Sequence, residues 1–201
     1  MEDLKRCFGS GDPLMAAYHD QEWGVPLRDD RALFELLVLE GFQAGLSWRT
    51  ILHKRAAFRR AFEGFDPERM ARFGRRDVDR LVQDAGIVRN RLKIEAAIDN
   101  ARAVLALQAE RGSFADYLWS FTENRVLRAG PRRRWTDVPT HTPISDAMAK
   151  DLKTHGFRFV GTTICYAFMQ SVGMVDDHLR GCHRYRAGGT TPVDRLPEIP
   201  R

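Results

Sequence analysis

Hydrophobic residues recur along this chain mostly at the spacing of an α-helix. In the stretch 30–40 they occupy positions i, i+3 and i+4 of one helical face, and an acidic residue occupies position i+7 of the same face. The residues on this face are Leu33, Leu36, Leu37 and Glu40. Alternation of apolar and polar residues, which marks β-strands, is scarce, so the pattern predicts an all-α fold.

Two helix starts are marked by a capping residue followed by proline. Asp66 precedes Pro67, and Thr142 precedes Pro143. A side-chain oxygen at the cap accepts a free N–H group, and proline suits the first helical position. Gly156 suits the C-terminal end of the second of these helices.

The stretch 77–107 predicts a short helix, a tight turn near Gly86 and a longer helix. The longer helix opens with Arg89, Arg91 and Lys93, although the N-terminus of a helix favours anions. A phosphate bound at this turn would explain the three cations. Solvated side chains with little effect on the helix dipole would explain them as well, and charge alone favours that alternative.

Length and composition predict one folded domain of a cytoplasmic protein. The chain has 201 residues and a formal net charge of +5, which indicates a polyanionic partner such as nucleic acid. The apolar run 36–39 is too short to cross a membrane, and the first residues carry no apolar signal segment. We expect a monomer with no membrane or protein partner, a domain over residues 1–187 and a flexible tail over 188–201, which is rich in Pro and Gly.

Two pairs of cysteine and histidine lie near opposite ends of the chain. The four residues are Cys7, His19, His178 and Cys182. They make a Cys2His2 set suited to tetrahedral zinc, and His183 competes for the fourth position. The alternative, two small buried cysteines and two surface histidines, is the more common arrangement for such isolated pairs.

Glu40 is the candidate for ligand chemistry. It continues the apolar face of its predicted helix, so its carboxylate points to the core, unless the helix ends at Leu39 and releases Glu40 to solvent. Tyr18 and Trp48 supply aromatic faces that, with an acidic group, suit a flat cation. No Gly-x-Ser-x-Gly or phosphate-loop motif is present, and Cys165 lies in an apolar segment, so a nucleophilic hydrolase is not indicated.

Five runs of the sequence, in order between about Cys7 and Tyr185, resemble the DNA-3-methyladenine glycosylase I family of bacterial base-excision-repair enzymes. The runs are 12–26 (DPLMAAYHDQEWGVP), 39–48 (LEGFQAGLSW), 81–94 (LVQDAGIVRNRLKI), 156–170 (GFRFVGTTICYAFMQ) and 175–185 (VDDHLRGCHRY). The resemblance implies an all-α helix-hairpin-helix enzyme. Such an enzyme flips 3-methyladenine out of alkylated double-stranded DNA and hydrolyses its N-glycosidic bond.

The family's functional residues can be carried over by position. Its metal site matches Cys7, His19, His178 and Cys182, which implies one structural zinc per chain tying the two ends together. Its base pocket matches Tyr18, Trp48 and Glu40, the last as the catalytic acceptor of hydrogen bonds from the flipped base. Leu46 resembles the residue that enters the base stack. The hairpin at Gly86 resembles the phosphate-binding element, with its cations Arg89, Arg91 and Lys93.

Two positions depart from the family pattern. The family has a stacking tryptophan two residues after the first zinc cysteine, where this chain reads Cys7-Phe8-Gly9, so Phe8 is the candidate for that role. The family also tends to carry a cysteine where this chain has His183.

Methylation at N3 makes adenine a cation, so its bond to the sugar is already weakened and a general acid is unnecessary. No lysine in the hairpin can form a Schiff base, which predicts a monofunctional enzyme without strand cleavage. Two other functions stay open on the residues alone. One is a zinc-stabilised module that only binds distorted DNA, and the other is a hydrolase of free nucleosides.

Overall fold

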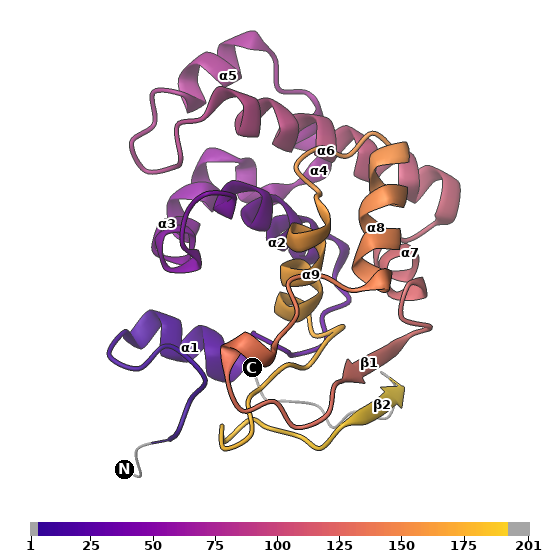
Figure 1. Cartoon of the computed structure of the whole chain (residues 1–201). Coiled ribbons are helices and arrows are strands. Elements are labelled where there is room, and N and C mark those ends of the chain that lie inside the picture. Colours follow the sequence, from indigo (N-terminus) through magenta and orange to yellow (C-terminus); the bar gives the residue numbers. More distant parts are fainter. Residues whose placement is uncertain (1–3, 193–201) are drawn as a thin grey trace.

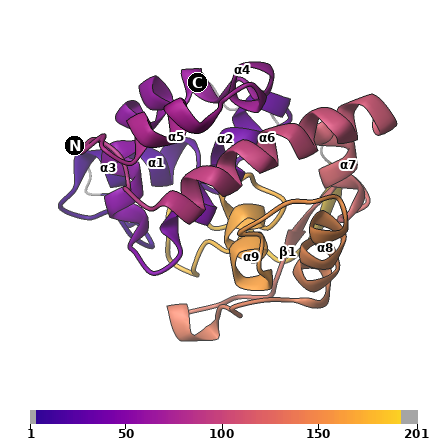
Figure 2. The same ribbon diagram turned by 90° about the horizontal axis from the view of Figure 1, so that it is seen from above.

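The computed structural model describes residues 4–192, which are mostly helical, as expected (Figure 1). Figure 2 shows the longest helix, α6, running diagonally across the molecule, with α4 and α5 on one side and α8 and α9 on the other. No helix in this part of the chain is long and apolar enough to span a membrane. The elements are α1 (Pro13–Gln21), α2 (Asp30–Gln43), α3 (Trp48–Ala61), η1 (Glu63–Phe65), α4 (Pro67–Ala71), α5 (Arg75–Leu81), α6 (Arg91–Arg111), α7 (Phe114–Ser120), β1 (Arg125–Arg128), η2 (Trp135–Asp137), α8 (Pro143–Thr154), α9 (Thr162–Ser171) and β2 (Gly189–Pro192).

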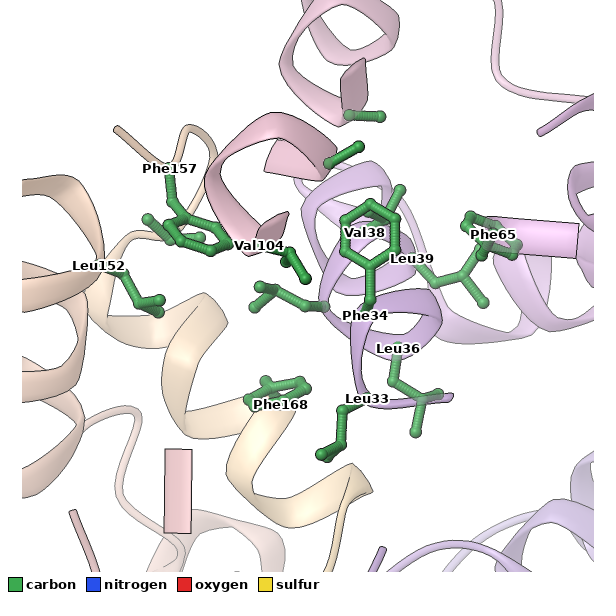
Figure 3. Packing of buried hydrophobic residues seen from close by; sticks show 14 of the residues in the cluster. Leu33, Phe34, Leu36, Val38, Leu39, Phe65, Val104, Leu152, Phe157 and Phe168 are labelled. Carbon is green, nitrogen blue, oxygen red and sulfur yellow. The ribbon is translucent and has the colours of Figure 1, made fainter. Parts of the chain in front are cut away.

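Helix α2 forms the centre of the core. Every residue from Leu33 to Phe42 is buried, so this helix is enclosed on all sides by α3, α6, α7 and α9. Figure 3 shows Phe34, Val38 and Leu39 of α2 among side chains from the surrounding helices. A helix this apolar is stable only inside the molecule, which is why the others arrange themselves around it.

The helix starts expected from capping residues are confirmed. The Asp66 carboxylate accepts a hydrogen bond from the Arg69 N–H at 3.1 Å, and α4 begins at Pro67. The Thr142 hydroxyl accepts from the Ser145 N–H at 3.3 Å, and α8 begins at Pro143. These contacts satisfy N–H groups that a helix leaves free at its start.

A two-stranded antiparallel sheet is the exception to the helical fold, and it corrects the expectation of a flexible tail. Residues 189–192 pair with β1, so that Thr191 faces Val126. The Arg128 guanidinium also donates to the Thr191 hydroxyl at 2.6 Å. The threonines and the complementary edge of β1 hold this part of the expected tail, whereas residues 193–201 lie outside the described residues.

The predicted helix, turn and helix are present as α5, residues 82–90 and α6. The Asp84 carboxylate accepts from the Gly86 N–H at 2.7 Å, which closes the turn. A Cβ atom at position 86 would lie 2.9 Å from the Cβ of Ala57 in α3, so only glycine fits there without displacement. The turn is thus packed against α3 and fixed in place.

The three cations at this turn have different environments. Arg89 is exposed, and Arg91 is exposed with an ion pair of 2.9 Å to Asp79. Lys93 corrects the prediction of a phosphate contact, because it is buried and its Nζ donates to the carbonyls of Phe42 and Ala44 at 2.9 and 2.5 Å. Its ammonium group neutralises the carbonyl end of α2, an interaction that spacing along α6 could not reveal.

We predict that Lys93→Ala lowers the free energy of unfolding by about 1–3 kcal/mol, because the buried carbonyl of Phe42 and the partly buried carbonyl of Ala44 lose their donor. The matched variant Arg89→Ala, which removes an exposed cation from the same turn, should change stability by less than about 0.5 kcal/mol. Urea unfolding of both proteins at neutral pH measures the difference. Equal stability of the two variants would contradict the structural role of Lys93.

Candidate functional site

The two expected cysteine and histidine pairs meet at one point. Their four ligand atoms lie within 4.8 Å of one another. The Cys182 sulfur lies 3.3 Å from His19 Nε2 and 3.7 Å from His178 Nδ1, and the Cys7 sulfur lies 3.7 Å from the same His178 nitrogen. A tetrahedral zinc ion would place sulfur and nitrogen ligands about 3.6 Å apart. The cluster could therefore hold a metal ion with four protein ligands.

Main-chain N–H groups point at both sulfur atoms. The Leu179 N–H donates to the Cys7 sulfur at 3.1 Å, and the Arg184 N–H donates to the Cys182 sulfur at 3.4 Å. Such bonds stabilise thiolates, which are the metal-binding form of cysteine. The loop after α9 therefore supplies one main-chain donor to each of the two sulfur atoms.

Burial favours the neutral forms of three of these ligands, Cys7, His19 and His178. It raises the pKa of the Cys7 thiol to about 12 and lowers the pKa of His178 to about 3. The pKa of His19 is lowered for the same reason. Neutral imidazole is the form that binds metal, whereas buried thiols need a cation beside them to ionise.

Asp20 fixes the orientation of His19. Its carboxylate oxygen lies 2.8 Å from His19 Nδ1, which leaves Nε2 facing the cluster. Arg6 and His183 contact the same carboxylate, with His183 Nε2 at 2.8 Å. His183, the competing candidate for the fourth ligand, thus lies outside the four-ligand group and supports the carboxylate that orients His19.

Glu40 is buried, and this decides between the two alternatives for it. Helix α2 continues to Gln43, and 4% of the Glu40 surface is exposed. Burial raises the pKa of its carboxyl group to about 8, and a hydrogen bond with the Ser171 hydroxyl acts in the opposite direction. The carboxyl group is thus short of partners that would stabilise its charge.

Aromatic rings from three segments lie together near Glu40. The Tyr18 ring is buried, with its centroid 5.2 Å from that of Trp48 and 6.3 Å from that of Phe8. Burial and the nearby charge of Glu40 raise the pKa of the Tyr18 hydroxyl well above its usual range. The structure therefore brings together Tyr18, Glu40 and Trp48, with Phe8 beside Tyr18.

Leu46 lies in the turn between α2 and α3. The turn is closed by a 2.6 Å hydrogen bond from the Leu46 N–H to the Gln43 carbonyl, and Gly45 adopts a positive φ of 78°. The Leu46 side chain is 44% exposed, although it is apolar. A tight turn therefore presents an apolar side chain to solvent close to the first residue of α3, Trp48.

Two residues of this region were not found from the sequence. Ser171 reaches Glu40 from the last turn of α9, and Trp135 packs on Phe8 from a segment far away along the chain. Both contacts are tertiary. A serine at a helix end and a tryptophan after a run of arginines carry no spacing relative to Glu40 or Phe8 that could have indicated them.

Comparison with known proteins gives consistent similarities. The profile of the family described as methyladenine glycosylase matches residues 8–185. DNA-3-methyladenine glycosylase 1 of Escherichia coli (strain K12) is 51% identical, with 90% of this chain and 97% of that protein covered. DNA-3-methyladenine glycosylase of Haemophilus influenzae is 48% identical over 82% of this chain and 89% of its own. The structure of 3-methyladenine DNA glycosylase I from Staphylococcus aureus is similar with a TM-score of 0.85 and 39% identity, covering 88% of this chain and 94% of that one.

We predict that Glu40→Gln stabilises the protein at alkaline pH. The pKa of Glu40 in the folded protein, about 8, exceeds its ordinary value of 4.5. Titration of Glu40 therefore lowers the free energy of unfolding as the pH rises between these two values. Glutamine does not titrate, so the variant should match the wild type near pH 4 and exceed it by about 2–5 kcal/mol at pH 9.

Glu35→Gln on the same helix is the control, and it should lower the free energy of unfolding where Glu40→Gln raises it. The Glu35 carboxylate is buried and binds Arg55 at 2.5 Å and Arg59 at 2.9 Å, so its loss leaves a half-buried cation without a partner. Urea unfolding of both variants between pH 4 and 9 measures the effect. A Glu40→Gln protein less stable than the wild type at pH 9 would show that Glu40 is held as a well-compensated anion.

Proposed function

The chain belongs to the methyladenine glycosylase family, and we propose that it flips 3-methyladenine out of alkylated duplex DNA and releases the base without cutting the strand. As a member of this family it is a glycosylase, an enzyme that hydrolyses N-glycosidic bonds. The observation that carries the proposal is the buried carboxyl group of Glu40 beside the rings of Tyr18 and Trp48.

A cationic base suits this pocket for two reasons. The faces of aromatic rings attract cations, and a cation beside Glu40 favours the ionised carboxylate that burial otherwise disfavours. The indole N–H of Trp48 is also buried and has no hydrogen-bond partner within residues 4–192. An acceptor on a bound base would satisfy this group, and the Glu40 carboxylate would accept from donors on the base edge.

Bond cleavage needs little from the protein once the base is held. The methylated base leaves as a neutral molecule, so no general acid is required, and positive charge passes to the sugar. We do not assign a residue that activates water. Asp99, the first aspartate of α6 after the turn, binds Arg102 at 3.1 Å and Arg158 at 2.7 Å, which supports a structural role.

The α5–α6 turn and the Leu46 turn are the proposed DNA contacts. Arg89 and Arg91 are exposed at the start of α6, where main-chain N–H groups also favour a phosphate. Leu46 is the proposed residue that enters the base stack in place of the flipped nucleotide. The lysines near the turn, Lys54 and Lys93, both donate to main-chain carbonyls, which supports base release without a Schiff base.

The metal proposal is one structural zinc ion held by the Cys2His2 cluster. Two sulfur and two nitrogen ligands with tetrahedral spacing suit zinc, and no ligand position is left for water. The ion would fix the N-terminal segment and α1 to the loop after α9. The ion would stabilise the folded structure, and base release would take place in the pocket at Glu40.

Base release from methylated duplex DNA, with the freed bases identified by mass spectrometry, tests the function. We expect release of 3-methyladenine, with kcat/KM rising about tenfold per pH unit below pH 8 and level above it, because binding of the cation requires ionised Glu40. Glu40→Gln should lower kcat/KM at pH 8 by about 10- to 100-fold and remove the pH dependence.

Asp99→Asn is the matched acid-to-amide control and should retain activity, since its carboxylate is bound to arginines. Affinity for undamaged duplex should be the same in both variants. Loss of activity in Asp99→Asn but not in Glu40→Gln would show that Asp99, and not Glu40, is the acid on which activity depends. A folded wild-type protein that binds DNA and releases no base would support a binding module.

For the metal, we predict about one zinc equivalent in the purified protein. Cys182→Ser should lose the metal and melt at a lower temperature, because a ligand is removed. Cys165→Ser is the matched control, since this third cysteine is buried in α9 outside the cluster. Metal retained in Cys182→Ser at wild-type thermal stability would refute the site.

A further inference from the structure

Residues 129–138 form a segment that is fixed to the metal-binding loop. Figure 2 shows it leaving β1, making the short turn η2 at the edge of the molecule and returning to α8. The Arg132 guanidinium binds the fully buried Asp177 carboxylate at 2.6 Å, and the Arg132 carbonyl accepts from the Arg180 N–H at 2.7 Å. Asp177 precedes the cluster residue His178, so the segment is anchored beside the metal cluster.

The turn of this segment is internally closed. The Asp137 carboxylate accepts from the N–H groups of Arg133 and Arg134 at 3.1 and 3.0 Å. These bonds set the conformation in which the next side chain, Trp135, is presented. The segment is therefore a rigid support, although much of its surface is exposed.

Trp135 is 42% exposed, and it is the only aromatic residue among the exposed large hydrophobic side chains of the described chain. Its indole N–H donates to the Cys7 carbonyl at 3.2 Å, and its ring centroid lies 6.1 Å from that of Phe8 and 6.0 Å from that of Trp23. Phe8 in turn lies beside Tyr18. A continuous series of rings thus leads from the base pocket to the surface.

The charge around Trp135 is positive. Arg133 and Arg134 are exposed, and the ion pair of Arg134 with Asp137 is 3.5 Å long with 79% of the Arg134 side chain exposed, so it is weak. Within residues 4–192 the Arg133 guanidinium has no hydrogen bond or ion pair, and only the main-chain N–H of Arg133 is bound. An exposed aromatic ring beside a free guanidinium group is the combination that binds unstacked nucleotides.

We propose that Trp135 and Arg133 form a second DNA contact beside the base pocket, in which the indole packs on a nucleotide next to the flipped one and the guanidinium binds its phosphate. This inference rests on the proposed function, because the flipped nucleotide defines its place. A purely structural cover over Phe8 and Trp23 would not need the arginines, and a purely electrostatic patch would not need an exposed indole.

The test uses the zinc-loaded protein and a fluorescein-labelled duplex with one tetrahydrofuran abasic site, which mimics a flipped nucleotide. Trp135→Ala should weaken binding about tenfold, as expected for loss of one stacking contact, and Trp135→Phe should recover most of it. Arg133→Ala should reduce the slope of log Kd against log salt by about one. Arg75→Ala, which removes an exposed arginine at the first residue of α5, is the matched charge control and should change neither.

Binding of free 3-methyladenine and metal content separate the contact from a structural role. Both should be unchanged in Trp135→Ala and Arg133→Ala. Loss of free-base binding or of metal in Trp135→Ala would show that Trp135 only supports Phe8 and Cys7, and wild-type DNA affinity in both variants would also overturn the proposal. A wild-type protein that binds the abasic duplex but releases no base would refute the proposed glycosylase function. The DNA contact of Trp135 and Arg133 would still be tested by the same binding measurements.

Discussion

Burial of the Glu40 carboxyl group costs free energy, and the groups around the end of α2 are arranged about this buried acid. Glu40 lies near the C-terminal end of α2, where the helix dipole is negative and disfavours an anion. The Lys93 ammonium group binds the carbonyls just beyond it, and the Ser171 hydroxyl, which donates to the Phe168 carbonyl at 2.9 Å, lies near the carboxyl group and lowers its pKa. Ser171 offsets only part of the cost of burial, because the pKa of Glu40 stays raised at about 8.

The Cys2His2 cluster and the aromatic rings near Glu40 are built from neighbouring residues. Cys7 and Phe8 are adjacent in the N-terminal segment, and Tyr18 and His19 are adjacent in α1. In each pair one residue belongs to the metal cluster and the other lies among the aromatic rings near Glu40. The position of the two rings therefore depends on the cluster, although no ligand of the cluster lies in the pocket. A metal ion bound to this cluster would therefore fix the positions of the two rings without taking part in the proposed reaction.

The sequence was sufficient for features that depend on local rules. The apolar face ending in Glu40, the caps at Asp66 and Thr142 and the Cys2His2 set are all present in the structure. The errors came from contacts between distant segments. Lys93 turns inward because the end of α2 lies against α6, and residues 189–192 become a strand because β1 offers an edge. The spacing within one segment carries no information on such partners.

The raised pKa of Glu40 also connects affinity with selectivity in the proposed function. Exposed arginines attract any DNA, since phosphates are the same in damaged and undamaged strands. The buried carboxyl group responds only to what enters the pocket. A neutral adenine leaves the pKa of Glu40 near 8, so its binding is not strengthened by the charge of the carboxylate. A cationic base lowers the pKa of Glu40, and its binding free energy improves by about 1.4 kcal/mol for each pKa unit of that lowering. The free energy that α2 loses by burying Glu40 is thereby recovered only when the base carries the charge of the lesion.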